Sequence, residues 1–174
     1  MTSLQTQPTI LTDTREQQPL VFSNLPSERA SLITADYSVQ GLEDTLLIER
    51  KSIPDLIGSL FGKDRERFQR ELQRMLSVPS RHLFIIGEGE GVTPEEQIRR
   101  HDYRSQTLPH VVLASVSAIQ AKGIQVHWLQ TPQEAARRIE SLVWYCWRTQ
   151  LKRLGVTPPR TPQAILKPNA INQK

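Results

Sequence analysis

An acidic and a basic side chain stand two residues apart at the end of an apolar run. The run, residues 45–48 (Thr-Leu-Leu-Ile), leads directly into Glu49 and, two residues later, Lys51. Because a β-strand alternates its side chains between two faces, Glu49 and Lys51 would point the same way. A carboxylate that binds a divalent cation, beside a lysine that orients or deprotonates the attacking water, suits hydrolysis of a phosphodiester. Surface strands also carry such pairs as plain salt bridges, so the chemistry needs support from other residues.

Three further acids occur where they could join this pair. Asp13 ends a short β-like run, Asp36 lies inside a predicted strand, and Asp55 opens the helix that follows Lys51. If the strands are neighbours, these carboxylates meet at one sheet edge and repel one another unless cations lie between them. Mg²⁺ prefers oxygen ligands, so a carboxylate-rich site without histidine or cysteine suits it.

The pattern of apolar residues predicts the elements that position these side chains. Residues 17–30 are expected to form a loop or short helix, and residues 88–103 an exposed excursion. Ser52 and Thr131 are expected to cap helices. Strands are expected at residues 9–11, 31–39, 45–51, 82–87 and 124–129, and helices at 53–61, 64–77, 109–122 and 132–153. This order predicts an α/β fold in which helices flank a mixed central sheet.

Composition sets the outer limits. The 174 residues fit one domain over residues 1–154 and a tail over 155–174 that carries four prolines and is expected to be disordered. The single cysteine, Cys146, excludes an internal disulfide and a cysteine-based zinc cluster. No apolar run approaches the roughly 20 residues that span a bilayer, and no signal-peptide pattern is present. We therefore expect an intracellular protein, in the cytoplasm or nucleoid if the source is bacterial or phage. The net charge of +4 permits a polyanionic partner.

Three motifs, taken together, resemble the nuclease domain of the XPF/Hef-type structure-specific endonucleases. They are Asp13-x-Arg15-Glu16, then Ala35-Asp36-Tyr37, then residues 48–60, which begin Ile-Glu-Arg-Lys-Ser-Ile-Pro-Asp. The family signature is Gly-Asp, a variable spacer, Glu-Arg-Lys and, after three more residues, Asp. An arginine followed four residues later by a glutamine also fits the family, and the likeness covers about residues 8–150.

The resemblance implies a restriction-endonuclease-like fold and cleavage of DNA with Mg²⁺, with Mn²⁺ as an alternative cation. Transferred position by position, Asp36, Glu49 and Lys51 match the central catalytic residues. The implied metal ligands are Asp36, Glu49 and Asp13, and the supporting residues are Asp13, Arg15, Glu16, Arg50 and Asp55. Arg50 would either bind a scissile-strand phosphate or hold Asp13 or Glu16 in place, and we favour the second role.

The expected DNA contacts lie on the helix predicted over residues 64–77. Arg67, Arg70 and Arg74 are spaced at i, i+3 and i+7 along one face, and such a stripe can be a solvated surface or a set of phosphate contacts. Arg65 and Gln69 are the arginine and glutamine that resemble the family.

The chain departs from the family pattern in three respects. Ala35 stands where the family has glycine, which suits a strand unless the backbone there needs a positive φ. The spacer from Asp36 to Glu49 and the segment 62–65 look lengthened. Relatives usually continue into tandem helix-hairpin-helix motifs, for which residues 155–174 are too short, so flap or fork specificity is not implied.

Three functional hypotheses follow. The leading one is a divalent-metal-dependent DNA endonuclease that cuts branched, flapped or nicked DNA, with DNA as its partner and no membrane or small-molecule substrate. Because the family pairs its nuclease domains through the last helices, a homodimer is expected through the apolar side of residues 132–153, where Trp144 and Trp147 are expected as core or interface residues. The second is a catalytically silent DNA-binding or dimerisation subunit, against which the intact Glu-Arg-Lys argues. The third is a resolvase or nickase, which the catalytic residues do not distinguish.

Overall fold

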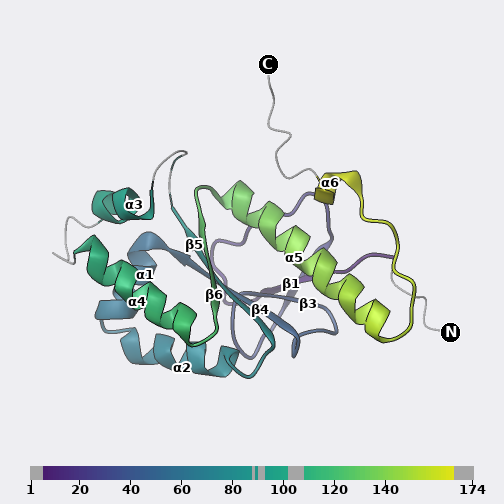
Figure 1. Cartoon of the computed structure of the whole chain (residues 1–174), viewed down its shortest axis with the longest axis horizontal. Helices are drawn as coiled ribbons and strands as arrows, with labels where there is room; N and C mark the ends of the chain where they lie inside the picture. Colours follow the sequence, from purple (N-terminus) through teal and green to yellow (C-terminus); the bar gives the residue numbers. More distant parts are fainter. Residues whose placement is uncertain (1–5, 88, 90–92, 102–107, 167–174) are drawn as a thin grey trace, which may run out of the picture.

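Helices cover both faces of a six-stranded mixed sheet (Figure 1). The computed structural model describes residues 6–87, 89, 93–101 and 108–166. Helix α5 (Pro132–Arg153) packs on one face of the sheet. Helices α1 (Ile53–Phe61), α2 (Arg65–Met75) and α4 (Pro109–Ala121) pack on the other. The predicted α/β architecture is thereby confirmed.

The sheet has the strand order β2-β1-β3-β4-β5-β6. Strand β3 is antiparallel to both of its neighbours, and the remaining pairs are parallel. The strands are β1 (Ile10–Asp13), β2 (Ser27–Ala30), β3 (Tyr37–Val39), β4 (Leu46–Ser52), β5 (Ser80–Ile86) and β6 (Gln125–Leu129). The antiparallel β3–β4 pair brings the start of β3, with Asp36 just before it, beside the Glu-Arg-Lys segment of β4.

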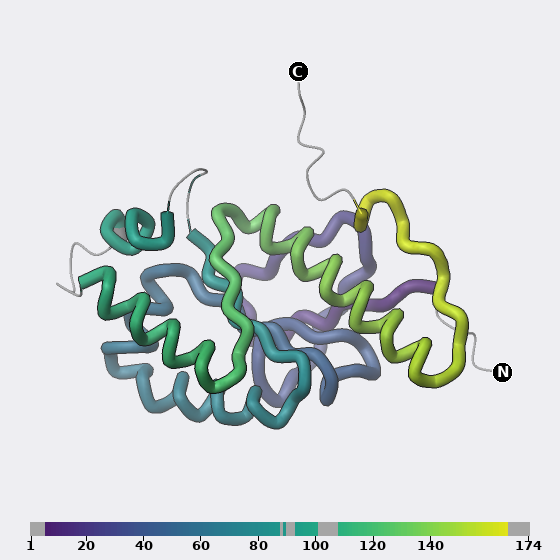
Figure 2. Tube along the Cα trace, viewed as in Figure 1, coloured from purple at the N-terminus to yellow at the C-terminus, as the bar shows by residue number. Residues whose placement is uncertain are grey.

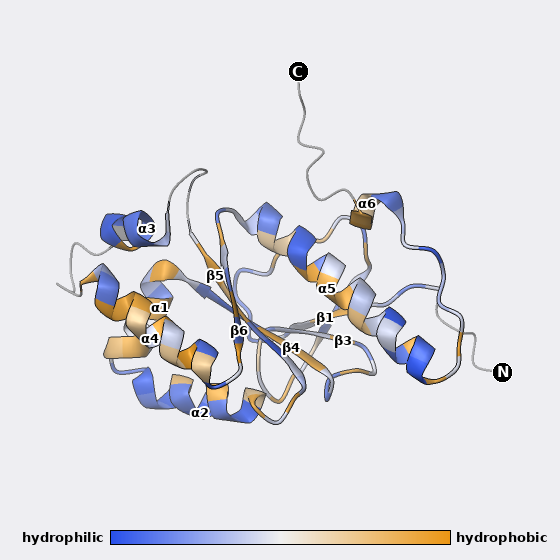
Figure 3. Ribbon diagram, viewed as in Figure 1, coloured by the Kyte–Doolittle hydropathy of each residue, from blue (hydrophilic) through white to orange (hydrophobic). Residues whose placement is uncertain are grey.

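Strict alternation along the central strands divides the core into two clusters. Leu46 and Ile48 of β4 pack with α5, whereas Leu47 packs with α1, α2 and α4. Since Glu49 and Lys51 continue the Leu47 face, the sheet directs both of them toward α1 and α2. Helix α2 is largely hydrophilic but carries recurring apolar residues, of which Phe68 and Leu72 are buried (Figure 3).

Two expected segments differ from the structure. The loop expected over residues 17–30 ends in the edge strand β2, an exposed Ser-Glu-Arg-Ala sequence without an apolar pattern that would reveal it. Within the excursion expected over residues 88–103, helix α3 (Pro94–His101) buries Ile98 completely and Gln97 almost completely. Its single fully buried apolar residue gives too weak a period to indicate a helix. Residues 88, 90–92, 102 and 103 of this segment lie outside the described residues.

The segment from Gly155 to Leu166 also differs from the disordered tail that we expected. It turns back along α5 and ends in the short helix α6 (Gln163–Leu166) (Figure 2). The indole Nε1 of Trp144 donates to Thr161 Oγ1 at 3.1 Å, and Ile165 is buried in the same cluster as Trp144. Residues 167–174 lie outside the described residues.

Trp144 and Trp147, expected either in the core or at a homodimer interface, are core residues. Trp144 is 2% exposed and Trp147 is 8% exposed, and both pack in the cluster beneath α5. A side chain that is already buried within its own chain has little surface left for a partner, so any pairing through α5 must use other residues. In the part of the chain that is described, no helix is both long and apolar enough to cross a membrane.

Two histidines form a partly buried polar contact between β5 and β6. His82 Nδ1 lies 2.9 Å from His127 Nε2, and His82 Nε2 lies 2.9 Å from Ser80 Oγ. Burial lowers the pKa of each histidine to about 4. For His82, the neighbouring His127 adds to this effect. The unfolded chain, with an ordinary histidine pKa of about 6.5, therefore takes up these protons first.

We predict that these histidines make the protein sensitive to mild acid. Their contribution to the free energy of unfolding is complete above pH ~6.5 and falls as the pH drops toward ~4. The free energy of unfolding is compared at pH 7 and pH 5 by urea unfolding. In His127→Phe, the fall between these two pH values should be about 1–2 kcal/mol smaller than in the wild type. Comparing the two proteins cancels the opposite contribution of buried carboxyl groups. Parallel pH profiles for the two proteins would contradict the prediction.

Candidate active site

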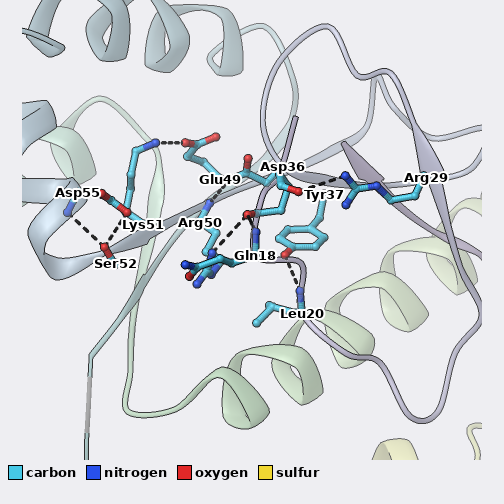
Figure 4. A network of polar contacts seen from close by, with 11 residues as sticks. Gln18, Leu20, Arg29, Asp36, Tyr37, Glu49, Arg50, Lys51, Ser52 and Asp55 are labelled. Carbon is cyan, nitrogen blue, oxygen red and sulfur yellow. Dashed lines mark hydrogen bonds and ion pairs between the residues drawn. The ribbon is translucent and has the colours of Figure 1, made fainter. Parts of the chain in front are cut away.

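Three segments meet where β3 pairs with β4. Tyr37 is paired with Ile48, so Asp36 lies directly across from Glu49, and Asp36 N donates to Ile48 O at 3.0 Å. The backbone N–H of Arg50 donates to Asp36 Oδ2 at 2.8 Å (Figure 4). The N–H of Asp13 donates to the Asp36 carbonyl at 2.8 Å, which attaches β1 to the same place. The expected neighbourhood of Asp36, Glu49 and Lys51 is therefore present.

Glu49 and Lys51 form a buried ion pair. Lys51 Nζ donates to Glu49 Oε1, as the shared strand face predicts (Figure 4). Glu49 is only 1% exposed, and its other carboxylate oxygen, Oε2, has no hydrogen-bond partner among the described residues. The ammonium also lies 5.2 Å from the centre of the Phe68 ring, a cation–π distance. A buried carboxylate oxygen without a donor is costly, which makes this a favourable position for a cation.

The electrostatics separate the roles of the three residues. Burial raises the pKa of Asp36 to about 6, against the Arg50 N–H that lowers it. Burial and then the charge of Asp36 raise the pKa of Glu49, which Lys51 opposes. Burial would lower the pKa of Lys51, but Glu49 raises it more, so its pKa lies above the ordinary lysine value. Lys51 is therefore an ammonium at neutral pH, and it supplies charge rather than accepting a proton.

The carboxylate of Asp13 is directed to other partners. Its Oδ1 accepts from Arg15 N at 2.8 Å and Nε at 2.7 Å, and its Oδ2 accepts from Leu32 N at 2.7 Å. These hydrogen bonds outweigh the effect of burial, so the pKa of Asp13 lies below its ordinary value. With both oxygens engaged in this way, Asp13 fits a role in holding the loop beyond β1 better than the role of a metal ligand.

Arg50 and Glu16 form a second partly buried pair. Arg50 Nη1 lies 3.4 Å from Glu16 Oε2, and Glu16 Oε1 accepts the N–H of Gln18 at 2.7 Å. Of the alternatives that the sequence left open for Arg50, the contact with Glu16 is the one present.

Asp55 joins Ser52 in a helix cap, with Ser52 Oγ donating to Asp55 Oδ2 at 2.7 Å (Figure 4).

A polar cleft of about 450 Å³ opens beside these residues. Its lining residues are Arg15, Glu16, Gln17, Gln18, Asp36, Arg50, Lys51, Pro54, Asp55, Gly58, Ser59, Asp64 and Arg67. All of the expected catalytic and supporting residues line it except Asp13 and Glu49, which are almost completely buried. A nucleic-acid phosphate in this cleft would meet Lys51 and Arg67.

The five expected DNA contacts on α2 have different surroundings. Arg67 lines the cleft and lies 3.5 Å from Asp64. Arg70 is exposed and pairs with Glu66 at 3.8 Å, and Gln69 accepts from Lys122 at 3.3 Å. Arg74 lines a different, more apolar hollow together with Ile33, and Arg65 is exposed. The structure thus brings only Arg67 of this set to the cleft.

Sequence reasoning missed Glu71. Its Oε2 lies 4.0 Å from Lys51 Nζ, and its charge acts on Asp36, Glu49 and Lys51. A usable signal exists: Glu71 is three residues after the buried Phe68, so it must lie at the margin of the buried face of α2. Among the residues that the structure describes, no group of three or more His, Cys, Asp or Glu side chains is arranged to hold a metal ion.

The family of this chain follows from its similarity to a known domain. A model of the ERCC4 domain matches residues 8–142. The chain belongs to the ERCC4-domain family. The match includes every expected catalytic and supporting residue, and the nuclease domain is of the XPF type that the three motifs predicted.

Solved structures show the same fold for this ERCC4 domain. XPF from Aeropyrum pernix is 26% identical, with a TM-score of 0.56 over 85% of this chain and 67% of that chain. XPF from Aeropyrum pernix in complex with DNA is 25% identical, with a TM-score of 0.57 over 84% of this chain and 66% of that chain. The chain thus spans about two thirds of these relatives. A search of curated proteins found no match.

Ala35, which stands where the motif resemblance predicts a glycine, has a left-handed backbone conformation. Its φ is 69°, and among the described residues it is the one non-glycine in the left-handed region. It is 3% exposed and packs in the same cluster as Leu47. The expected strand from residue 31 cannot run through this conformation, so β3 starts only at Tyr37.

We predict that Ala35→Gly changes stability by less than about 1 kcal/mol. Relief of about 1–2 kcal/mol of strain is offset by the lost buried methyl group and the greater freedom of the unfolded chain. Ala35→Val should cost about 2 kcal/mol or more, because a β-branched residue is strongly disfavoured at positive φ. Urea unfolding measures both variants, with Ala30→Val in the extended strand β2 as the control. Equal stabilities of Ala35→Val and Ala35→Gly would contradict the prediction.

Proposed function

We propose that this ERCC4 domain is a divalent-metal-dependent endodeoxyribonuclease. The observation that carries the proposal is the buried Glu49, one carboxylate oxygen of which has no partner in the described part of the chain. Glu49 also lies across from Asp36 and is bonded to the charged Lys51. A carboxylate pair beside an ammonium, next to a cleft with arginines, suits phosphodiester hydrolysis.

The residues present fit a hard divalent cation. Asp36 and Glu49 offer carboxylate oxygens as ligands. The Arg50 N–H donates to Oδ2 of Asp36, which leaves Oδ1 of Asp36 for a cation. Mg²⁺ and Mn²⁺ are commonly held by one or two carboxylates, with water and substrate phosphates completing the ligand set, so two acids suffice. The bound cation would supply Lewis-acid polarisation of the phosphodiester.

The side chains divide the remaining work. Lys51 faces the cleft as an ammonium, so it stabilises negative charge that develops on the phosphoryl oxygens. Arg67 lines the same cleft and binds backbone phosphates, whereas Arg15, whose guanidinium is bonded to Asp13 and to the Leu32 carbonyl, holds the loop beyond β1. Arg50 holds Glu16 and, through its own N–H, fixes the orientation of Asp36.

We propose branched, flapped or nicked DNA as the substrate, and a role in DNA repair or recombination. Support comes from the family and from the similar Aeropyrum pernix XPF, one structure of which is a complex with DNA. A homodimer remains part of the proposal, but through residues other than Trp144 and Trp147. The alternative is a catalytically silent DNA-binding subunit, favoured only because no third His, Cys, Asp or Glu of the described residues is placed with Asp36 and Glu49 to hold a metal ion.

We predict that Asp36→Asn, Glu49→Gln and Lys51→Met each reduce DNA cleavage at least about 100-fold, because each removes charge at the reacting phosphate. The measurement is cleavage of labelled nicked, flapped, forked and four-way DNA with Mg²⁺, Mn²⁺ or EDTA. DNA binding, measured by fluorescence anisotropy, should change far less. Asp44→Asn, at an exposed turn distant from the cleft, is the control.

Two results would count against the nuclease proposal. Cleavage that persists in all three variants would exclude this site. Binding without cleavage by the wild-type protein, across all of these DNA forms and both cations, would favour the silent subunit.

We predict that Mn²⁺ binds more weakly in mild acid. The pKa of Asp36 is about 6, and a proton on this carboxyl group competes with the cation. The association constant for Mn²⁺ should fall roughly tenfold or more per pH unit below pH ~6 and level off above ~7. Isothermal titration calorimetry of the DNA-free protein from pH 5 to 8 tests this. An association constant that does not change across this range would contradict it.

A further inference from the structure

The ammonium of Lys51 is enclosed from three sides. Glu49 Oε1 accepts its hydrogen bond, the Phe68 ring lies 5.2 Å away, and Glu71 Oε2 lies 4.0 Å away. Phe68 and Glu71 are three residues apart on α2, so one face of that helix supplies both contacts. The Lys51 side chain is 15% exposed and that of Glu71 is 23% exposed, so the contact between them is largely shielded from water.

The proposed function creates a conflict at Lys51. Its close partner is Glu49, the same carboxylate that the proposal assigns to the cation. A divalent cation at Oε2 of Glu49, the oxygen without a partner among the described residues, would share one carboxylate with Lys51, which is bonded to Oε1. The cation therefore weakens that bond and repels the ammonium. Leaving a largely buried ammonium without an anion is strongly unfavourable, so a second carboxylate is needed to keep Lys51 charged and in place.

Glu71 meets this need from where it lies. At 4.0 Å it is at the limit of an ion pair, and a shift of about 1 Å would bring it to hydrogen-bond distance. Its partial exposure leaves its side chain room to make that shift. The other acids of α2 and its N-cap have arginine partners instead of Lys51, since Asp64 pairs with Arg67 and Glu66 pairs with Arg70.

We propose that Glu71 is a positioning residue that receives Lys51 when Glu49 binds the divalent cation. This inference rests on the proposed function. Phe68 holds the ammonium during the exchange, because a cation over an aromatic face remains attracted while its carboxylate partner changes. Lys51 then remains beside the cleft as a cation, free to face the phosphate.

The test is a double-mutant cycle on Mn²⁺ binding by the full chain without DNA, measured by calorimetry. Glu71→Gln should weaken Mn²⁺ binding about fivefold when Lys51 is present, because Lys51 then loses its second carboxylate. In the Lys51→Met background the same change should weaken binding less than about twofold. Glu66→Gln, on the same helix but 91% exposed, is the matched control and should have no effect in either background.

Cleavage kinetics provide a second readout. Glu71→Gln should lower kcat about tenfold with an unchanged KM for DNA, since it displaces Lys51 without removing a phosphate contact. Glu71→Asp, shorter by one methylene group but still charged, should restore part of the loss. Thermal unfolding confirms that each variant is folded.

The possible failures are distinguishable. An equal loss of Mn²⁺ affinity in both Lys51 backgrounds would mean that Glu71 acts on the cation directly, and no loss in either would mean that it does not position Lys51. Both results overturn this inference and leave the nuclease proposal intact. A wild-type protein that neither binds Mn²⁺ nor cleaves DNA overturns both.

Discussion

The antiparallel pairing of β3 with β4 is the constraint on which the site depends. It places Asp36 across from Glu49 and directs the Arg50 N–H to the Asp36 carboxylate. Two acids are thereby held together in a largely buried place, which raises the pKa of both. The ion pair with Lys51 offsets part of that cost, and a divalent cation would offset the rest. The unfavourable burial of two neighbouring acids is therefore also the feature that favours a cation at this place.

Backbone strain and local hydrogen bonds maintain this arrangement. Ala35 adopts a left-handed backbone conformation immediately before Asp36. Its packing in the cluster with Leu47 stabilises this strained conformation. Asp13 and Arg15 fasten the loop after β1, whereas Arg50 and Glu16 fasten the margin of the cleft. These residues resemble catalytic ones in sequence because they are charged and close to the site, but their contacts are those of supports.

Sequence reasoning succeeded where the signal was periodic or local. It predicted the two-residue spacing that places Glu49 and Lys51 on one face, the Ser52 and Thr131 caps, and the long helix α5. It failed where tertiary contacts decide. The edge strand β2 has no apolar pattern, and the destination of the Asp13 carboxylate depends on Leu32, which is 19 residues away. Glu71 approaches Lys51 only because α2 packs on the sheet, which no motif encodes.

The most direct test of this account is the position of a cation. A crystal of the protein grown with Mn²⁺ should show an anomalous scattering peak about 2–2.4 Å from carboxylate oxygens of both Asp36 and Glu49. In that crystal, Lys51 should have moved away from Glu49, to which it is bonded in the structure without a cation. A peak held by Asp13 and Glu16, or no peak while Lys51 remains bonded to Glu49 at saturating Mn²⁺, would contradict it.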